Sequence, residues 1–173
     1  PVKLGAILPL TGELADVGEW LREGIELAVE DYERAHRNGF DLELVILDDG
    51  SVADEIPAIM AELESEEVLG IIGPIGSEAF AAAARTRRDP KLPIISPTAT
   101  EVQRPHESVY TLYDFVTREL DVAADLAHWV VEELGLKRVG ILYPKMGRGR
   151  AVSAFEDAIV AAGGVVVAYE VLD

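Results

Sequence analysis

The stretch GIIGPIGSEAF, residues 70–80, decides the fold class of this chain. Its first residues form an apolar run of the kind that becomes a strand buried on both faces. Gly73, Pro74 and Gly76 then interrupt the run. A helical pattern begins at Ser77. A buried strand that turns directly into a helix is the repeating unit of a parallel α/β sheet.

The same alternation extends over the whole chain. Strands are predicted at residues 2–10, 41–49, 68–74, 92–100, 108–115, 138–144 and 165–173. Helices are predicted between them, at residues 17–36, 55–65, 77–88, 119–135 and 149–163. In the helix at 119–135, the apolar spacing predicts buried contacts from Leu120, Ala123, Ala124, Leu126, Val130 and Leu134. We therefore predict an α/β fold with a doubly wound, mostly parallel sheet between two layers of helices.

The composition excludes several classes of function. The chain has 173 residues, of which 32 are acidic and 15 basic, and its net charge is −17. This charge argues against binding nucleic acid or an anionic membrane surface. The absence of cysteine excludes disulfides, thiolate catalysis and cysteine–zinc sites. No apolar run approaches the roughly 18 residues of a membrane-spanning helix. No signal peptide is visible, although a secreted protein whose signal has been removed looks the same.

The candidate site residues lie beyond the carboxyl ends of the predicted strands, where open parallel sheets bind their ligands. Ser77 follows Gly76 at a predicted helix start. Its hydroxyl could cap that helix. Alternatively, it could hold a small anion together with the N–H groups of the first helical turn. The neighbouring glycines favour the second role, because they let a ligand approach the backbone closely.

A second polar loop, SPTAT, ends the strand predicted at 92–100. Its hydroxyls, on Ser96, Thr98 and Thr100, could be ordinary turn residues. Two such loops at the same edge of one sheet nevertheless suggest a pocket rich in neutral donors. Val17 or Trp20 could wall this pocket, but core packing is the favoured interpretation for Trp20.

Other motifs point to different chemistry. Asp48 and Asp49 end a strand and could bind Mg²⁺, but that site needs a further acid at another strand end. Capping and turn roles are therefore favoured for both. The loop YPKMGRGRA, which contains Gly147 and Gly149, is an incomplete nucleotide-binding fingerprint. No G-x-S-x-G elbow is present, and none of the three histidines adjoins an obvious nucleophile. We predict no catalytic residue, no metal and no cofactor.

Taken in order, four segments resemble a known family: KLGAILPLTGELADVGEWLREGIELAVED, VLGIIGPIGSEAF, LPIISPTATE and KRVGILYPKMGRGRAVSAFEDAIVAAGG. They are similar to the type I periplasmic binding proteins, and above all to the leucine/isoleucine/valine-binding, receptor-family substrate-binding components of ABC transporters. The resemblance covers essentially the whole chain. It implies a non-enzymatic, extracytoplasmic protein, either periplasmic or lipid-anchored at the cell surface. Such a protein binds an amino acid or a related small carboxylate for a membrane permease.

The resemblance also implies site residues. Ser77 would supply a hydroxyl to the ligand carboxylate, Thr98 would offer backbone groups, and Thr100 would contact the amino-acid head group. Val17 and Met146 fall near positions where the family has aromatic residues, so this chain departs from the family there. The residues expected to bind the ligand are Ser77, Thr98, Ala99, Thr100, Val17, Gly76 and Met146.

Family members are considerably longer and hold the ligand between two lobes. By that resemblance, we expect residues 1–116 to form an N-terminal ligand-binding lobe. Residues 117–173 would follow the first crossover and form part of a second lobe, so the chain resembles an N-terminal portion. An incomplete sheet leaves apolar edges, and the chain is therefore expected to form a homodimer or to exchange strands.

Two alternatives remain open. The lipoprotein activators of cell-wall synthases carry a similar LLPLSG opening and a similar YP…G…AF…A…GG segment. That resemblance would make this chain a cell-envelope regulator that binds a protein partner rather than a solute. The third hypothesis is an enzyme that anchors a nucleotide or phosphate compound at residues 147–150.

Overall fold

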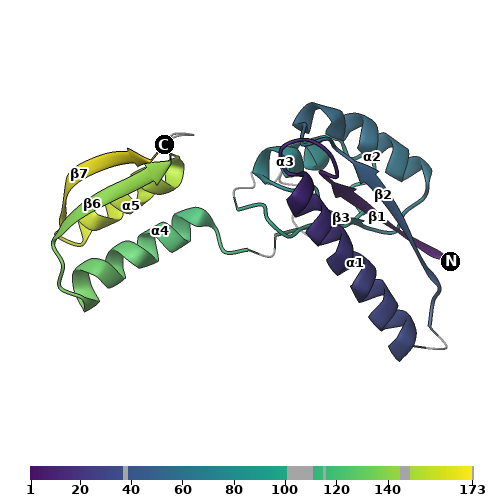
Figure 1. Ribbon diagram of the computed structural model, residues 1–173, viewed down its shortest axis with the longest axis horizontal. Helices are drawn as coiled ribbons and strands as arrows, with labels where there is room; N and C mark the ends of the chain where they lie inside the picture. Colours follow the sequence, from purple (N-terminus) through teal and green to yellow (C-terminus); the bar gives the residue numbers. More distant parts are fainter. Residues whose placement is uncertain (37–38, 101–110, 115, 145–148, 173) are drawn as a thin grey trace. The chain divides into compact units, whose positions relative to one another are not determined.

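The computed structural model describes residues 1–36, 39–100, 111–114, 116–144 and 149–172. Internal contacts divide the chain into two compact units, Pro1–Val116 and Thr117–Asp173, called unit 1 and unit 2 below. Each unit consists of parallel strands with helices packed against them (Figure 1).

Unit 1 is built on a five-stranded sheet. Its strands are β1 (Val2–Leu8), β2 (Leu42–Asp48), β3 (Ile71–Ile72), β4 (Ile94–Ser96) and β5 (Leu112–Asp114). Its helices are α1 (Ala15–Ala35), α2 (Ile56–Ser65) and α3 (Ser77–Thr86), with a 3-10 turn, η1 (Ala53–Glu55), before α2. The order across the sheet is β2-β1-β3-β4-β5, and every neighbouring pair is parallel. The predicted fold class is confirmed.

The main core of unit 1 lies between the sheet and the helices α2 and α3. Its fully buried large side chains come from both helices and from the strands: Ile56, Met60, Leu63, Phe80, Ile7, Ile71, Ile94 and Leu112. Ala6 and Leu8 alternate with Ile7 along β1 and therefore face the other side of the sheet. Both are fully buried, and α1 contacts β1 and β2.

Helix α1 lies close to the sheet over a narrow face. Among its described residues only Gly18 is buried, and a Cβ at this position would lie 2.1 Å from the Pro9 carbonyl oxygen. The missing side chain therefore lets the helix approach the end of β1 directly. Trp20 is 69% exposed, so the expectation that it packs into the core is wrong. Two residues turn an α-helix through more than half a circle, which directs Trp20 away from the face that Gly18 occupies.

Unit 2 contains α4 (Glu119–His128), which continues as a short π-helix, η2 (Trp129–Glu133), followed by β6 (Arg138–Pro144), α5 (Arg150–Ala161) and β7 (Val165–Leu172). β6 and β7 pair in parallel. The buried cluster of this unit consists of Ala127, Val131 and Ile159.

The predicted buried contacts of the helix at 119–135 are only partly realised. Ala123 is buried, but Leu126 and Leu134 are exposed. The helical pattern correctly identifies apolar positions, but β6, α5 and β7 do not cover all of them among the described residues. The expectation of burial is therefore wrong for these two leucines in the described structure.

Candidate functional site

The candidate site lies where the parallel strands of unit 1 end. Because all five strands run in the same direction, the segments that follow β1, β2, β3 and β4 emerge at the same edge of the sheet. These segments contain most of the residues that the sequence analysis selected. The loops at residues 73–77, after β3, and 97–100, after β4, form its centre.

Two hydrogen bonds join these loops. The Gly76 N–H donates to the Thr98 hydroxyl oxygen over 2.9 Å. The Thr100 N–H donates to Ser77 Oγ over 3.2 Å. The structure therefore brings four of the predicted site residues together and uses two of their hydroxyl oxygens to hold the loops in place.

Ser96 ties the same loops together from the interior. It is fully buried, its hydroxyl donates to the Pro74 carbonyl over 3.0 Å, and its oxygen accepts the Ala99 N–H over 3.1 Å. Ala99 itself is buried in the core. The three hydroxyl residues of SPTAT therefore differ in burial. Ser96 is buried and has a structural role, whereas Thr98 and Thr100 are only partly buried.

Helix α3 begins without a side-chain cap. Its N-cap is Gly76, at a φ of 82°, and Ser77 is its first helical residue. The Phe80 N–H donates to the Gly76 carbonyl over 3.1 Å. The N–H groups that precede Phe80 in the helix therefore have no acceptor within the helix. The capping alternative for Ser77 is wrong, because the side chain lies one residue inside the helix. Such an uncapped start, at the positive end of the helix dipole, favours an anionic group.

A cavity of about 200 Å³ opens beside this helix start. Its lining comes from three strand ends and includes Pro9, Leu14, Asp49, Ser51, Val52 and residues 75–79. Gly76 and Ser77 are the predicted site residues in this lining, which also includes the acidic residues Asp49 and Glu78. The cavity therefore brings two acidic residues together with the start of α3.

Asp48 fastens the loop after β1 to the end of β2. Its Oδ1 accepts the N–H groups of Leu10, Thr11 and Gly50 over 2.8, 3.1 and 2.8 Å. Its Oδ2 accepts the Thr11 hydroxyl over 2.7 Å. Burial by itself would raise the pKa of Asp48, but these hydrogen bonds outweigh it and hold the pKa below its ordinary value. The turn role favoured from the sequence is confirmed for Asp48.

The pKa of Asp49, the next residue, shifts in the opposite direction. Asp49 is 4% exposed, and its Oδ1 accepts the Ser51 N–H over 2.9 Å. Burial raises the pKa of Asp49, the Ser51 N–H opposes that rise, and the charge of Asp48 adds to it. Asp49, and not Asp48, is among the residues that line the cavity. Within the described residues, no group of three His, Cys, Asp or Glu side chains could hold a metal ion.

The other predicted site residues do not line the cavity among the described residues: Thr98, Ala99 and Thr100 lie in the neighbouring loop after β4. Val17 lies half-buried in the first turn of α1 and is not part of the cavity lining. Met146 lies outside the described residues, together with most of the loop that carries the incomplete nucleotide fingerprint. The sequence analysis did not select Glu78 for the cavity, although its position directly after Ser77 is a signal that could have identified it.

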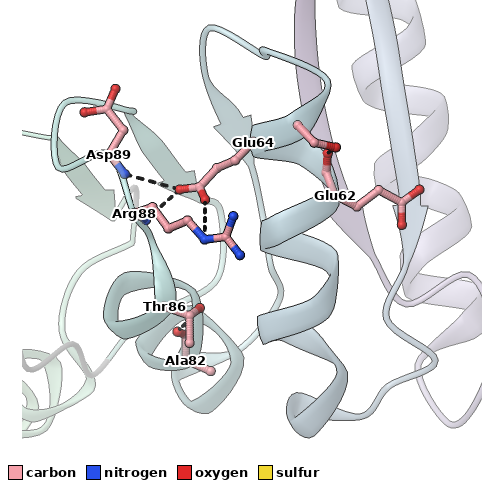
Figure 2. A network of polar contacts seen from close by, with 7 residues as sticks. Glu62, Glu64, Ala82, Thr86, Arg88 and Asp89 are labelled. Atoms are coloured by element: carbon pink, nitrogen blue, oxygen red, sulfur yellow. Dashed lines mark hydrogen bonds and ion pairs between the residues drawn. The ribbon is translucent and has the colours of Figure 1, made fainter.

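A second polar cluster lies at the opposite edge of unit 1, before β4 (Figure 2). Glu64, near the end of α2, accepts the N–H groups of Arg88 and Asp89 over 2.6 and 3.3 Å, and its other oxygen lies 3.8 Å from Arg88 Nε. These contacts tie α2 to the loop after α3. Figure 2 also shows Thr86, whose hydroxyl donates to the Ala82 carbonyl at the far end of α3.

No helix in the described part of the chain is long and apolar enough to cross a membrane.

Comparison with known proteins gives a consistent result. The chain matches the periplasmic binding protein family over residues 1–172. The Leu/Ile/Val-binding protein homolog 7 of Brucella melitensis is 31% identical over 153 residues, which are 85% of this chain and 35% of that protein. The leucine-, isoleucine-, valine-, threonine- and alanine-binding protein of Pseudomonas aeruginosa is 23% identical over 168 residues, which are 96% of this chain and 45% of that protein.

Solved structures agree with the family match. The branched-chain amino acid transporter substrate-binding protein LivJ of Streptococcus pneumoniae, solved in complex with isoleucine, is 26% identical, with a TM-score of 0.75 over 99% of this chain and 49% of that chain. A solute-binding protein of Rhodopseudomonas palustris, solved in complex with 3,4-dihydroxybenzoic acid, is 24% identical and shares the fold, with a TM-score of 0.76 over 99% of this chain and 47% of that chain.

This chain spans about half the length of the solved proteins, and 35% and 45% of the two curated relatives. The matched proteins bind solutes rather than catalyse reactions, which confirms the expectation that the chain is not an enzyme. The family model extends through both units, including the loops that form the candidate site. The chain belongs to the periplasmic binding protein family.

Proposed function

We propose that this chain is part of an extracytoplasmic solute-binding component of an ABC transporter, and that it binds the carboxylate of an amino acid at the start of α3. Unit 1 is then the ligand-binding lobe. Unit 2 is part of a second lobe, which closes over the ligand in the whole protein. The partner is a membrane permease, and the protein acts in the periplasm or anchored at the cell surface.

The observation that carries this proposal is the pair of hydrogen bonds between the two loops. Gly76 to Thr98 and Ser77 to Thr100 hold an uncapped helix start beside a cavity at the carboxyl edge of the sheet. Preformed loops lower the entropic cost of binding, because the donors are already in place before the ligand arrives. A carboxylate there gains hydrogen bonds and the favourable end of the helix dipole.

The charge of the site favours an amino acid over a simple anion. Asp49 and Glu78 line the same cavity, and residues 1–116 contain 23 acidic against 9 basic residues. This charge repels a net anion such as benzoate. An amino acid carries an ammonium group that the two carboxylates attract, so the repulsion is offset. The isoleucine bound to LivJ and the amino acids in the name of the Pseudomonas relative agree with this choice.

The test is an NMR titration of the ¹⁵N-labelled chain with isoleucine and, separately, with isoleucinamide, which lacks the carboxylate. Isoleucine should shift the amide signals of Gly76, Ser77, Glu78, Thr98 and Thr100. Isoleucinamide should bind at least about tenfold more weakly, because it cannot make charge-assisted hydrogen bonds to the helix start. Benzoate should also bind more weakly than isoleucine.

Ser77→Ala should weaken isoleucine binding, since it removes a hydroxyl at the mouth of the site. Thr86→Ala is the matched control, because it removes a hydroxyl from the other end of the same helix. The proposal is wrong if isoleucine leaves the amides of residues 76–78, 98 and 100 unshifted. It is also wrong if isoleucine and isoleucinamide bind equally well, or if Thr86→Ala weakens isoleucine binding as much as Ser77→Ala.

A further inference from the structure

Asp49 is a buried acid whose side chain has few partners. It is 4% exposed, and within the described residues its carboxylate accepts one hydrogen bond, from the Ser51 N–H to Oδ1. Asp48, the preceding residue, accepts four. Among the ion pairs of the described residues, none includes Asp49. A buried charge normally has a counter-ion or a full set of donors, so Asp49 would gain from a further partner.

The cavity that Asp49 lines has room for such a partner. Its volume is about 200 Å³, several times the roughly 30 Å³ that one water molecule occupies. Its lining also contains Gly76 and Ser77, at the uncapped start of α3. A solute carboxylate bound to that helix start therefore shares the cavity with Asp49, and the charges of the solute and of Asp49 act on each other.

The three segments around the cavity, residues 9–14, 49–55 and 75–79, contain acidic residues and no basic ones. Besides Asp49 they include Glu13 before α1, Asp54 and Glu55 in η1, and Glu78 in the first turn of α3. Burial, with a smaller contribution from the charge of Asp48, raises the pKa of Asp49 against the opposing effect of the Ser51 N–H. These segments therefore offer Asp49 no counter-ion, and its ionisation responds to the charge of whatever enters the cavity.

We propose that Asp49 selects between solutes by their charge. When ionised, Asp49 favours an amino acid, whose ammonium group offsets the negative charge, and disfavours a carboxylate that has no ammonium group. When protonated, Asp49 loses both effects, and the site then accepts the simple carboxylate as well. The inference rests on the proposed function, because it concerns a solute carboxylate held at the start of α3. It adds that one site changes its preferred class of ligand with pH.

The two classes of solute should shift the pKa of Asp49 in opposite directions. A bound amino acid stabilises the ionised form, so it lowers the pKa of Asp49, and its affinity rises as the pH rises through that pKa. A bound simple carboxylate stabilises the protonated form, so it raises the pKa of Asp49, and its affinity falls over the same range. A change of one pKa unit corresponds to about a tenfold change in affinity.

The test compares isoleucine with 3-methyl-2-oxopentanoate, which has the same side chain and carboxylate but a carbonyl oxygen in place of the ammonium group. Both solute carboxyls are stronger acids than an aspartate side chain and stay ionised throughout. Amide NMR titrations from about pH 4 to pH 8 give the two dissociation constants. The preference for isoleucine, which is the ratio of these constants, should rise by about tenfold or more over this range.

Asp49→Asn keeps the shape of the side chain and removes its charge. It should lower the preference for isoleucine at pH 8 by about tenfold or more and remove most of the dependence on pH. The matched control is Glu43→Gln, which removes the same charge from an exposed position near the other end of β2. It should leave the pH dependence unchanged.

Carboxyl ¹³C NMR of the unsubstituted chain provides a second measurement, which does not depend on the folding of any variant. The pKa of Asp49 should fall when isoleucine is added and rise when 3-methyl-2-oxopentanoate is added. A residue with a purely structural role would show no such opposite response.

The proposal is overturned if both solutes show the same pH dependence, or if Asp49→Asn retains the dependence. It is equally overturned if Glu43→Gln abolishes the dependence, or if neither solute changes the pKa of Asp49. These failures leave the amide shifts of residues 76–78, 98 and 100 intact, which distinguishes them from failure of the proposed function. If neither solute produces those shifts, both proposals are wrong.

Discussion

Strands β1 and β6 have similar sequences and different surroundings. Residues 3–8 read KLGAIL, and residues 138–143 read RVGILY. Each strand is followed by a helix and then by a parallel partner strand, β2 or β7. β1 has neighbours on both sides, whereas β6 has one among the described residues. An apolar run therefore indicates that a strand is suited to burial, and the elements packed around the strand decide whether it is buried.

The two units differ accordingly in the size of their cores. The buried cluster of unit 1 contains 16 described residues, drawn from two helices, four strands and the segments that connect them. That of unit 2 contains three. Because hydrophobic stabilisation grows with the apolar area removed from water, unit 1 should be the more stable unit on its own.

The largest expected effect comes from truncating a phenylalanine in each unit. Phe80 is fully buried in unit 1, so Phe80→Ala should lower the free energy of unfolding of that unit by about 3–5 kcal/mol. Phe155 is only half-buried in unit 2, and Phe155→Ala should cost less than half as much. Urea unfolding with peptide-resolved hydrogen exchange measures each unit separately. Equal losses in the two units would contradict the comparison of their cores.

A smaller effect should follow from removing the carboxylate of Asp48, which joins the loop after β1 to the end of β2. Asp48→Ala should cost unit 1 about 1–3 kcal/mol, since it leaves the N–H groups of Leu10, Thr11 and Gly50 without their acceptor. In the folded state the pKa of Asp48 lies below its ordinary value of 3.8. Its contribution is therefore fully present above this ordinary value and is lost as the pH falls through the lower, folded-state pKa.

Asp49 is the control for this prediction, because its pKa moves the other way. A raised pKa means that the folded state holds its proton more tightly, so ionisation of Asp49 reduces the stability of unit 1 as the pH rises from the ordinary value through the raised one. Asp49→Asn should therefore cost little at neutral pH and should remove this part of the pH dependence. Unfolding free energies measured between pH 3 and 8 test both variants. A larger loss at neutral pH for Asp49→Asn than for Asp48→Ala would refute the assignment.

The smallest expected effect comes from replacing a glycine at the same position of each strand, Gly5 in β1 and Gly140 in β6. A Cβ at Gly5 would lie 3.1 and 3.2 Å from the two methyl carbons of Leu63, so Gly5→Ala should destabilise unit 1 by about 1–2 kcal/mol through overpacking. At Gly140 the nearest atom to an added Cβ is Ala168 Cβ, at 3.9 Å, which is an ordinary contact. Gly140→Ala should therefore be neutral or slightly stabilising. Thermal unfolding followed by circular dichroism compares the two, and equal destabilisation would show that β6 is as crowded as β1.

The sequence predicted the elements better than their extents. A strand was predicted at residues 68–74, but the β3 ladder contains only Ile71 and Ile72. Hydrogen bonds to neighbouring strands nevertheless continue on both sides, from Leu69 N–H to the Lys3 carbonyl and from Gly73 N–H to the Ile95 carbonyl. Pro74 has no N–H to donate, which limits the ladder at that end. An apolar pattern records suitability for burial and does not record which backbone groups find partners.

The sequence predicts only part of the candidate site, because some of its contacts join residues far apart in the chain. Gly76 and Ser77 were selectable because a strand end, a glycine and a helix start are adjacent in sequence. Ser96 could not be separated from Thr98 and Thr100, since all three are hydroxyl residues in one short loop. Their difference arises from Pro74 and Gly76, which lie 22 residues away in the chain.

By itself, the sequence determined the alternation of strands and helices, the parallel α/β class and the edge of the sheet at which a site would form. These follow from hydrophobic periodicity and from glycine and proline positions, which act between residues close together in the chain. Only the tertiary structure decided that the pKa values of Asp48 and Asp49 shift in opposite directions and that Trp20 faces outward. Each depends on which distant residues come into contact, because burial and hydrogen-bond partners are properties of the assembled fold and not of the local pattern.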